Sequence, residues 1–274
     1  MTLIQSIKDQ INYQFFLLNG QKPWTRGYLV YKRRSILQSL AANPFASAQW
    51  PQGYGFRLDE RIVEYAWLFS RLPDRSGRLL DAGSILNFDF LIAHPTLQSK
   101  QIFISTLAPE NQCFWRSGVS YIYEDLRDTC YRDNYFDWIA SLSTIEHIGL
   151  DNTLLYTHDP AKKEMDAEAY LTALKEYHRI LKPGGTLYLS FPFGKHQNYG
   201  WFQIFNAVML DRVIQTFAPR QVRELHFRYD PSGWLPSSRD ESSNATYFDI
   251  HQQQTYDADY AAASRAIVCL ELVK

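Results

Sequence analysis

Short segments that contain polar residues, and in one case a glycine, follow several apolar runs in the first half of the chain. They are Asp81, Ala82, Gly83 and Ser84 after RLL, Ser105 and Thr106 at the end of QIFIST, and Asp125 and Leu126 just after VSYIY. In an open α/β sheet, ligands bind beyond the carboxyl ends of the strands, so we expect these residues to line one rim. There Gly83 permits a tight turn and close approach of a ligand to the backbone, while Asp81 supplies a hydrogen-bond acceptor. The pattern predicts a site for a small ligand.

The elements that must position these residues follow from the apolar pattern after Gly77. Short apolar runs alternate with longer amphipathic stretches, which predicts an α/β, Rossmann-like fold with a mostly parallel sheet and helices on both faces. Seven strands are expected, near residues 78–83, 101–105, 119–123, 136–142, 186–194, 222–229 and 265–273. Helices are expected over 166–181, where KPGG ends the helix near Lys182, and over 201–217. No convincing helix separates the last two strands, so we expect an antiparallel pair at the edge of the sheet.

Two further segments are expected to surround this sheet. Residues 1–75 are mostly helical by pattern, with a break over 43–56 that collects proline and glycine, and they predict a helical N-terminal cap packed on the core. Residues 76–274 form the expected Rossmann-like domain. Within it, 231–260 is rich in Ser, Asp, Gln, Tyr and Asn, and so long a connection predicts a functional loop or lid.

Composition narrows the class of protein. With 28 basic and 29 acidic residues the net charge is −1, so no global field would hold a nucleic-acid backbone, and no nucleic acid is expected as partner. No apolar run suits a signal peptide or a membrane span, which predicts a cytoplasmic protein. Cys113, Cys130 and Cys269 form no CxxC pair and are expected to be reduced, buried thiols. No HxxxH or GxSxG pattern occurs, so neither a metal nor a serine nucleophile is expected.

The segment LLDAGS resembles the first motif of class I S-adenosylmethionine-dependent methyltransferases, a hydrophobic strand followed by Asp-x-Gly-x-Gly-x-Gly. Ile85 and Asn87 stand at the second and third glycine positions, so the motif is degenerate. The resemblance implies S-adenosyl-L-methionine as cofactor, with Asp81 to Ser84 among its ligands.

The second and third strands extend the resemblance. In the family the second strand usually ends in an acid that holds the ribose hydroxyls. Here Ser105 or Thr106 takes that place, and the nearest acid is Glu110. The segment EDLRD resembles the part of the family where an acid accepts from the adenine amino group and the next backbone N–H meets the ring, which implies these roles for Asp125 and Leu126.

The longest resemblance is YFDWIASLSTIEHIGLDN with LKPGGTLYLSFPFG, whose order and spacing are similar to small-molecule methyltransferases. It implies that Ser141 and Ser143 lie near the amino-acid end of the cofactor. His147 is expected where cofactor and acceptor meet, and it could remove a proton from an acceptor hydroxyl. The alternative is a packed, hydrogen-bonded histidine, and Glu146 is expected to be structural.

Two functions from different classes are carried forward. The first is a methyltransferase acting on a small polar acceptor, such as a sugar or glycan precursor, where the acceptor rests on analogy. The second is a catalytically inactive module of the same fold that serves in binding or as a scaffold, which Ile85, Asn87 and the missing acid favour. A nicotinamide-dependent oxidoreductase ranks third because GxGxxG is absent. The sequence leaves the acceptor, the methylated atom and the oligomeric state open.

Overall fold

The computed structural model describes residues 3–153, 155 and 159–274 of the 274-residue chain, and it divides into two compact units. Unit 1 comprises Met1–Arg71 and His226–Ile267, and unit 2 comprises Leu72–Leu225 and Val268–Lys274. Two strands of the sheet are therefore shared between the units. No described helix is both long and apolar enough to cross a membrane.

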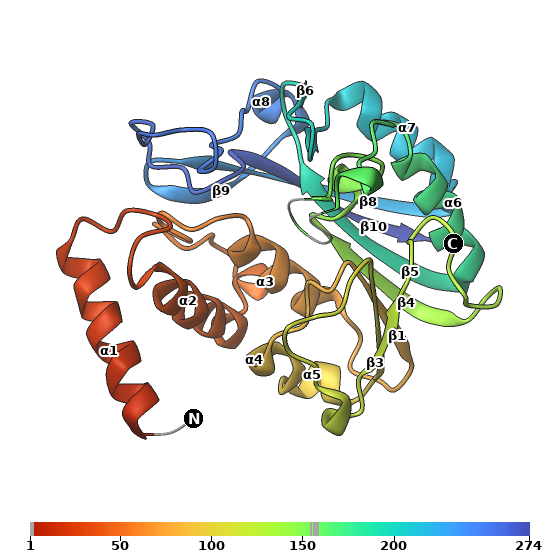
Figure 1. Ribbon diagram of the computed structural model, residues 1–274, viewed down its shortest axis with the longest axis horizontal. Helices are drawn as coiled ribbons and strands as arrows, with labels where there is room; N and C mark the ends of the chain where they lie inside the picture. Colours follow the sequence, from red (N-terminus) through yellow and green to blue (C-terminus); the bar gives the residue numbers. More distant parts are fainter. Residues whose placement is uncertain (1–2, 154, 156–158) are drawn as a thin grey trace. The chain divides into compact units, whose positions relative to one another are not determined.

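The sheet has eight strands in the order β3-β2-β1-β4-β5-β10-β8-β9 (Figure 1). Their bounds are β1 Arg78–Ala82, β2 Gln101–Thr106, β3 Ser120–Tyr123, β4 Phe136–Leu142, β5 Leu181–Pro192, β8 Gln221–Asp230, β9 Gly233–Ser237 and β10 Ala266–Val273. The pairs β1·β2, β1·β4, β2·β3 and β4·β5 are parallel. The expected Rossmann-like, mostly parallel sheet is confirmed. The strand order reverses between β1 and β4, which is where open α/β sheets bind ligands.

The C-terminal strands run antiparallel, and the last one lies inside the sheet. The backbone N–H of Gly184, near the start of β5, donates to the carbonyl of Lys274 just after the end of β10. Likewise Arg220 N–H, before β8, donates to the carbonyl of Val273. The expected antiparallel pair is therefore confirmed, but its place at the edge was wrong. Strand β9, which pairs antiparallel with β8, forms the edge and raises the strand count from the expected seven to eight.

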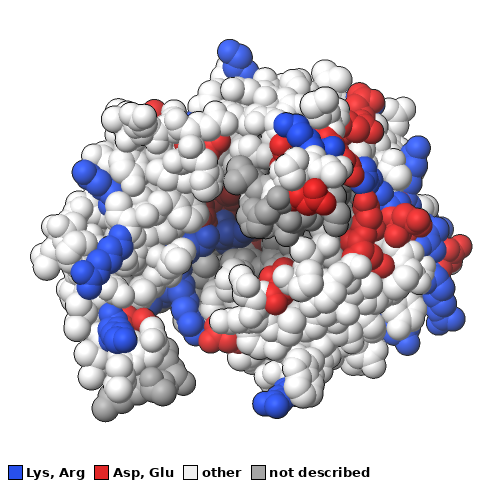
Figure 2. All heavy atoms as spheres, in the orientation of Figure 1, with Lys and Arg blue, Asp and Glu red and all other residues white. Residues whose placement is uncertain are grey.

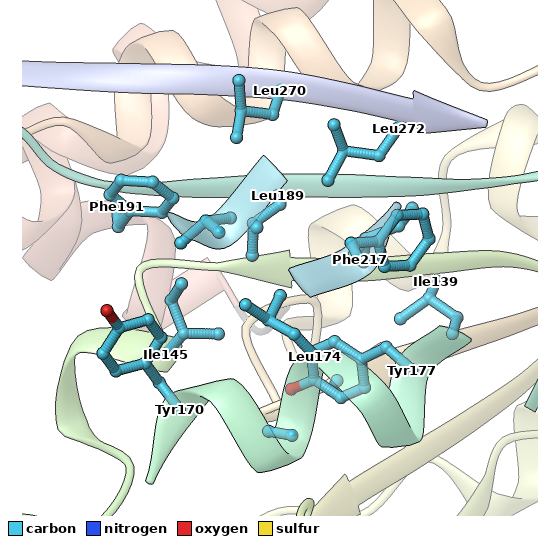
Figure 3. Packing of buried hydrophobic residues seen from close by; sticks show 14 of the residues in the cluster. Ile139, Ile145, Tyr170, Leu174, Tyr177, Leu189, Phe191, Phe217, Leu270 and Leu272 are labelled. Atoms are coloured by element: carbon cyan, nitrogen blue, oxygen red, sulfur yellow. The ribbon is translucent and has the colours of Figure 1, made fainter. Parts of the chain in front are cut away.

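Helices α6 (Tyr170–Ile180) and α7 (Ala207–Phe217) lie side by side in unit 2 (Figure 1). Figure 3 shows Tyr170, Leu174 and Tyr177 on the side of α6 that faces the strands, in one buried cluster with Ile139 of β4 and Leu189 of β5. These side chains recur at helical spacing, so one face of α6 is apolar. Burial of each large side chain contributes about 1.5–3 kcal/mol, and this cluster fixes the strands that carry the site.

Smaller elements of unit 2 lie in the connections. They are the short helices α4 (Asp89–Ile92) and α5 (Pro95–Gln98), the 3-10 turns η2 (Trp115–Ser117), η3 (Ile145–His147) and η5 (Pro160–Lys162), and the two-residue strands β6 (Gln197–Asn198) and β7 (Gln203–Ile204). The helix expected to begin at Trp201 begins at Ala207, because Gln203 and Ile204 pair with β6 and the Asn206 side chain accepts from Met209 N–H as an N-cap. Two thiols expected to be buried, those of Cys113 and Cys130, are exposed, and only Cys269 is buried.

Unit 1 contains helices α1 (Leu3–Leu18), α2 (Tyr28–Ala42) and α3 (Arg61–Arg71), the turn η1 (Pro44–Ala46), strand β9 and the short helix α8 (Arg239–Ser242). The N-terminal segment packs directly on residues of the 226–267 segment. Trp234 Nε1 donates to the Leu58 carbonyl at 2.9 Å, and Trp50 Nε1 donates to the Trp234 carbonyl at 2.7 Å. The expected N-terminal cap and the 231–260 segment therefore belong to one unit, and their roles as a cap on the core and as a lid stay predictions.

Candidate functional site

A cavity of about 330 Å³ opens in unit 2 at the carboxyl ends of four parallel strands. Its walls come from residues that follow β1, β2, β3 and β4, completed by the segment before α6. They are Gly83, Thr106, Leu107, Asp125, Leu126, Arg127, Thr144, His147, Ile148, Gly149, Leu150, Asn152, Ala161, Lys163 and Glu164. The volume is at the low end of the range for small-molecule sites, and the position is the switch point of the sheet.

The turn after β1 is held by Asp81, whose side chain is fully buried. Its two carboxylate oxygens accept hydrogen bonds from the backbone N–H groups of Ile85 and Leu86, at 3.1 and 2.8 Å. Gly83 has φ +112°, and a Cβ there would collide with the Thr144 side chain. Asp81 therefore shapes the turn, and the absence of a side chain at Gly83 lets the Thr144 side chain pack against it at the cavity wall.

Side chains at the two degenerate glycine positions are held outside the cavity wall. Asn87 accepts from the Tyr121 hydroxyl at 2.8 Å and donates to the Gln112 carbonyl at 2.9 Å. Ile85 is 7% exposed and does not line the cavity. The departures from the glycine motif therefore leave the cavity open.

Strand β2 ends with one hydroxyl turned to each side. Ser105 is fully buried and donates to Glu124 at 2.7 Å, with the Tyr131 hydroxyl at 3.1 Å. Thr106 is 2% exposed, lines the cavity, and its Oγ1 has no hydrogen-bond partner among the described residues. Because a buried hydroxyl without a partner is unfavourable, Thr106 is well suited to receive a polar group of a ligand.

Asp125 lines the cavity, but its carboxylate is already hydrogen-bonded to Arg127. Arg127 approaches its carboxylate through Nε at 3.0 Å and Nη2 at 2.5 Å, and also through its backbone N–H. Burial raises the pKa of Asp125, but the hydrogen bonds and charge of Arg127 outweigh it and hold this pKa below the ordinary value, so the carboxylate is ionised at neutral pH. The same guanidinium donates twice to Glu164, at 2.7 Å each, which ties the segment before α6 to the cavity wall.

His147 lines the cavity from the turn after β4. Its Nδ1 is 2.9 Å from the Trp201 carbonyl, which can only accept, so Nδ1 carries the proton and Nε2 the lone pair in the neutral ring. The Glu146 carboxylate, buried beside it, stands 4.0 Å from Nε2. Asn152 Nδ2 donates to the carbonyls of His147 and Leu150, which closes this turn and leaves Oδ1 buried without a partner among the described residues.

The structure brings five of the residues expected from the sequence to the cavity wall: Gly83, Thr106, Asp125, Leu126 and His147. Six others do not line it: Asp81, Ala82, Ser84, Ser105, Ser141 and Ser143. Among these, Ser84 donates to Glu110 at 2.5 Å, and Ser141 lies in the core at 3.3 Å from the Tyr177 hydroxyl. Sequence reasoning missed Arg127, Thr144, Asn152, Lys163 and Glu164. Among these residues Thr144 has a signal in the sequence, its place two residues after the end of β4.

Residues 100–189, which include β2 to β4 and most of β5, match a family model described as a methyltransferase domain. This part of the chain is therefore similar to a methyltransferase domain. The match confirms the resemblance to the class I methyltransferase superfamily and, with it, S-adenosyl-L-methionine as the cofactor of the domain. No curated protein matches the chain by sequence.

Several solved structures are similar to the chain at low identity. Burkholderia thailandensis 1,6-didemethyltoxoflavin-N1-methyltransferase, with bound 1,6-didemethyltoxoflavin and S-adenosylhomocysteine, is 14% identical over 89% of this chain and 84% of its own, with a TM-score of 0.44. A SAM-dependent methyltransferase from Archaeoglobus fulgidus is 11% identical over 79% and 96%, with a TM-score of 0.49. An arsenic(III) S-adenosylmethionine methyltransferase from Chlamydomonas reinhardtii is 13% identical over 88% and 73%, with a TM-score of 0.44. The fold assignment rests on the strand order and the family model, not on these likenesses.

Proposed function

We propose that the methyltransferase domain binds S-adenosyl-L-methionine in the cavity of unit 2 and methylates a small polar acceptor, such as a sugar or glycan precursor. The observation that carries the proposal is the convergence of residues from four strand ends on one cavity at the switch point of the sheet. The choice of a sugar as the acceptor rests on analogy with the family. The acceptors named for similar structures are varied and favour no single compound.

The residues present fit this cofactor. Gly83 lines the cavity without a side chain, Thr106 offers an unused hydroxyl for a ribose, and Asp125 offers an ionised carboxylate for the adenine amino group. A carboxylate with two oxygens has about four acceptor positions, and four hydrogen bonds from Arg127 already occupy them, so the adenine amino group would have to share or displace one of these bonds. Thr106 replaces the family's acid with a single neutral hydroxyl, which predicts weaker binding of the ribose.

Bound S-adenosyl-L-methionine supplies a methyl group on a sulfonium sulfur, a leaving group that needs no acid. The protein must align the acceptor and, for a hydroxyl acceptor, take up its proton. His147 suits the second task, because its Nδ1–H is engaged by Trp201 and its Nε2 lone pair can accept the proton. Glu146 then stabilises the imidazolium as a positioning residue. Asn152 Oδ1 suits the first task, since it accepts from an O–H or N–H donor.

One observation favours the scaffold alternative. Asp125 is held by Arg127, and Arg127 by Glu164, so the expected adenine ligand is already part of an ion-pair network. Against this, the side chains of Ile85 and Asn87 leave the cavity open.

Calorimetric titration with S-adenosylhomocysteine tests the proposal. We expect saturable binding that Asp125→Ala weakens, whereas Asp128→Ala, a control at an exposed acid three residues along, does not. If the folded chain binds no S-adenosylhomocysteine at millimolar concentration, the enzyme proposal fails and the scaffold is favoured. If binding is found, transfer of labelled methyl to a panel of sugars and nucleotide sugars tests the acceptor, with His147→Gln expected to reduce turnover while binding persists.

A further inference from the structure

Helix α1 of unit 1 carries an exposed apolar stripe. Ile4, Ile7, Ile11, Phe15 and Leu18 are exposed by 67%, 52%, 54%, 39% and 83%. At 100° per residue these positions fall within an arc of about 80° on the helix. Isolated apolar side chains on a surface need no explanation, but a continuous stripe of five along one helix marks an interaction surface.

The other side of α1 is already used. Phe16, which is 1% exposed, packs on Tyr28 and Tyr31 of α2, and Asn12 and Gln10 accept hydrogen bonds from Arg26 and Arg34. At 100° per residue Phe16 lies about 140° from Ile11, the centre of the stripe, and Asn12 and Gln10 lie about 100° from it on either side. Within the stripe, the one contact described is that of Phe15, whose ring centre lies 4.8 Å from the Arg26 guanidinium. A helix of this length in water depends on packing for its stability.

The stripe is symmetric about its centre. Counted from Ile11, the other four positions are −7, −4, +4 and +7. Two antiparallel copies of α1 related by a twofold axis at Ile11 would therefore place Ile7 against Phe15 and Ile4 against Leu18 of the other copy. This is the self-complementary geometry of an isologous dimer interface.

The charged residues of α1 are also compatible with a second copy of the chain as its partner. The only charged residues of α1 are Lys8 and Asp9, so two copies would not repel each other. In Figure 2 this helix, at the lower left, shows mostly uncharged surface. One lysine is too little for the basic flank with which helices bind anionic membranes.

We propose that α1 pairs antiparallel with α1 of a second copy of this chain, with Ile11 on the twofold axis. A contact between two helices of this length is small, so a dimer that dissociates on dilution is expected.

Sedimentation velocity of the full chain over a hundredfold range of concentration tests the pairing. The unmodified chain should shift from monomer to dimer, Ile11→Asp should stay monomeric, and Val208→Asp should still dimerise. Val208 lies on α7 and is 67% exposed, so it is a matched control for adding a charge at an exposed apolar site. Circular dichroism establishes that the helix content of each variant is unchanged.

The twofold axis at Ile11 allows a second, more specific test. Because residue 11 faces its own copy, Ile11→Lys alone should also stay monomeric, and a mixture of Ile11→Asp with Ile11→Lys should recover the dimer. A monomeric unmodified chain at every concentration, a dimer that persists in Ile11→Asp, or a mixture that stays monomeric would overturn the proposal. Binding of the unmodified chain to neutral phosphatidylcholine vesicles without self-association would identify a membrane surface instead.

Discussion

Replacing Thr106 by Val should raise stability and weaken ligand binding at the same time. The Thr106 hydroxyl is buried, lines the cavity and has no partner in the described residues, so the folded protein carries its desolvation penalty. Such a penalty is about 1–3 kcal/mol, and the isosteric valine removes it. The free energy of unfolding of the ligand-free protein should therefore rise by about 1 kcal/mol.

The effect on binding has the opposite sign. If the hydroxyl meets the ribose, its loss removes one hydrogen bond worth about 0.5–1.5 kcal/mol, so the affinity for S-adenosylhomocysteine should fall about twofold to tenfold. Urea unfolding of the free protein and calorimetric titration measure the two effects separately.

Thr129→Val is the matched control. The Thr129 hydroxyl is also buried, but it donates to Glu176 at 2.5 Å, away from the cavity. Its loss leaves a buried carboxylate with one donor fewer and should lower the free energy of unfolding by about 1.5–3 kcal/mol, with binding unchanged. The reasoning is refuted if Thr106→Val destabilises the protein as Thr129→Val does, or if it leaves the affinity unchanged.

Three further predictions concern the turn after β1, the ion pair at the cavity and unit 1. Gly83→Ala should abolish S-adenosylhomocysteine binding in titrations and lower the free energy of unfolding by about 1–3 kcal/mol, because φ is +112° and the new Cβ meets Thr144. Unchanged binding would show that this turn does not touch the ligand. A double-mutant cycle of Arg127→Gln and Glu164→Gln should give a coupling free energy of unfolding below about 1 kcal/mol that decreases with salt, since both side chains are partly exposed. A salt-independent coupling of several kcal/mol would contradict this. Burial, then the charges of Asp59 and Glu64, raise the pKa of Glu60 from 4.5 to about 7. The folded state thus keeps a proton that the unfolded chain loses, and the free energy of unfolding should fall by about 3 kcal/mol from pH 4.5 to 7. Glu60→Gln should flatten this part of the pH profile of urea unfolding, and an unaltered slope would count against it.

The strands that hold the site could be predicted because each is a separate apolar run followed by polar residues or glycine that mark its end. Helix α6 could be predicted for the same reason, since its apolar side chains recur at helical spacing. Strand β9 could not, because GWLPS has no strand pattern of its own and is held by its pairing with β8, where Trp234 lies opposite Tyr229. The start of α7 was missed because the apolar pattern continues through Gln203 and Ile204, which pair with β6 instead.

The sequence predicts which strand ends form the site, but it does not predict which side chains at those ends face the cavity. Ser105 and Thr106 are adjacent, and successive side chains of a strand point to opposite faces, so only one of them can line the cavity. The choice of Thr106 depends on Glu124, which is far along the chain but binds Ser105. Arg127 and Glu164 were missed because their position at the cavity arises from a contact across 37 residues that no local pattern records.

The glycine motif need not be complete for the cavity to form. The shape of the turn is set by Asp81, which accepts from two backbone N–H groups and so fixes residues 83 to 86 whatever side chains follow. Within residues 83 to 86, Gly83 is the position that combines a positive φ with no room for a Cβ, which would meet Thr144, and it is the one glycine of the motif that the chain keeps. At the other two positions, Ile85 and Asn87 lie outside the wall, and Asn87 binds Tyr121 and Gln112 there. Loss of those two glycines therefore argues less against cofactor binding than the motif alone suggests, and this favours the enzyme over the scaffold.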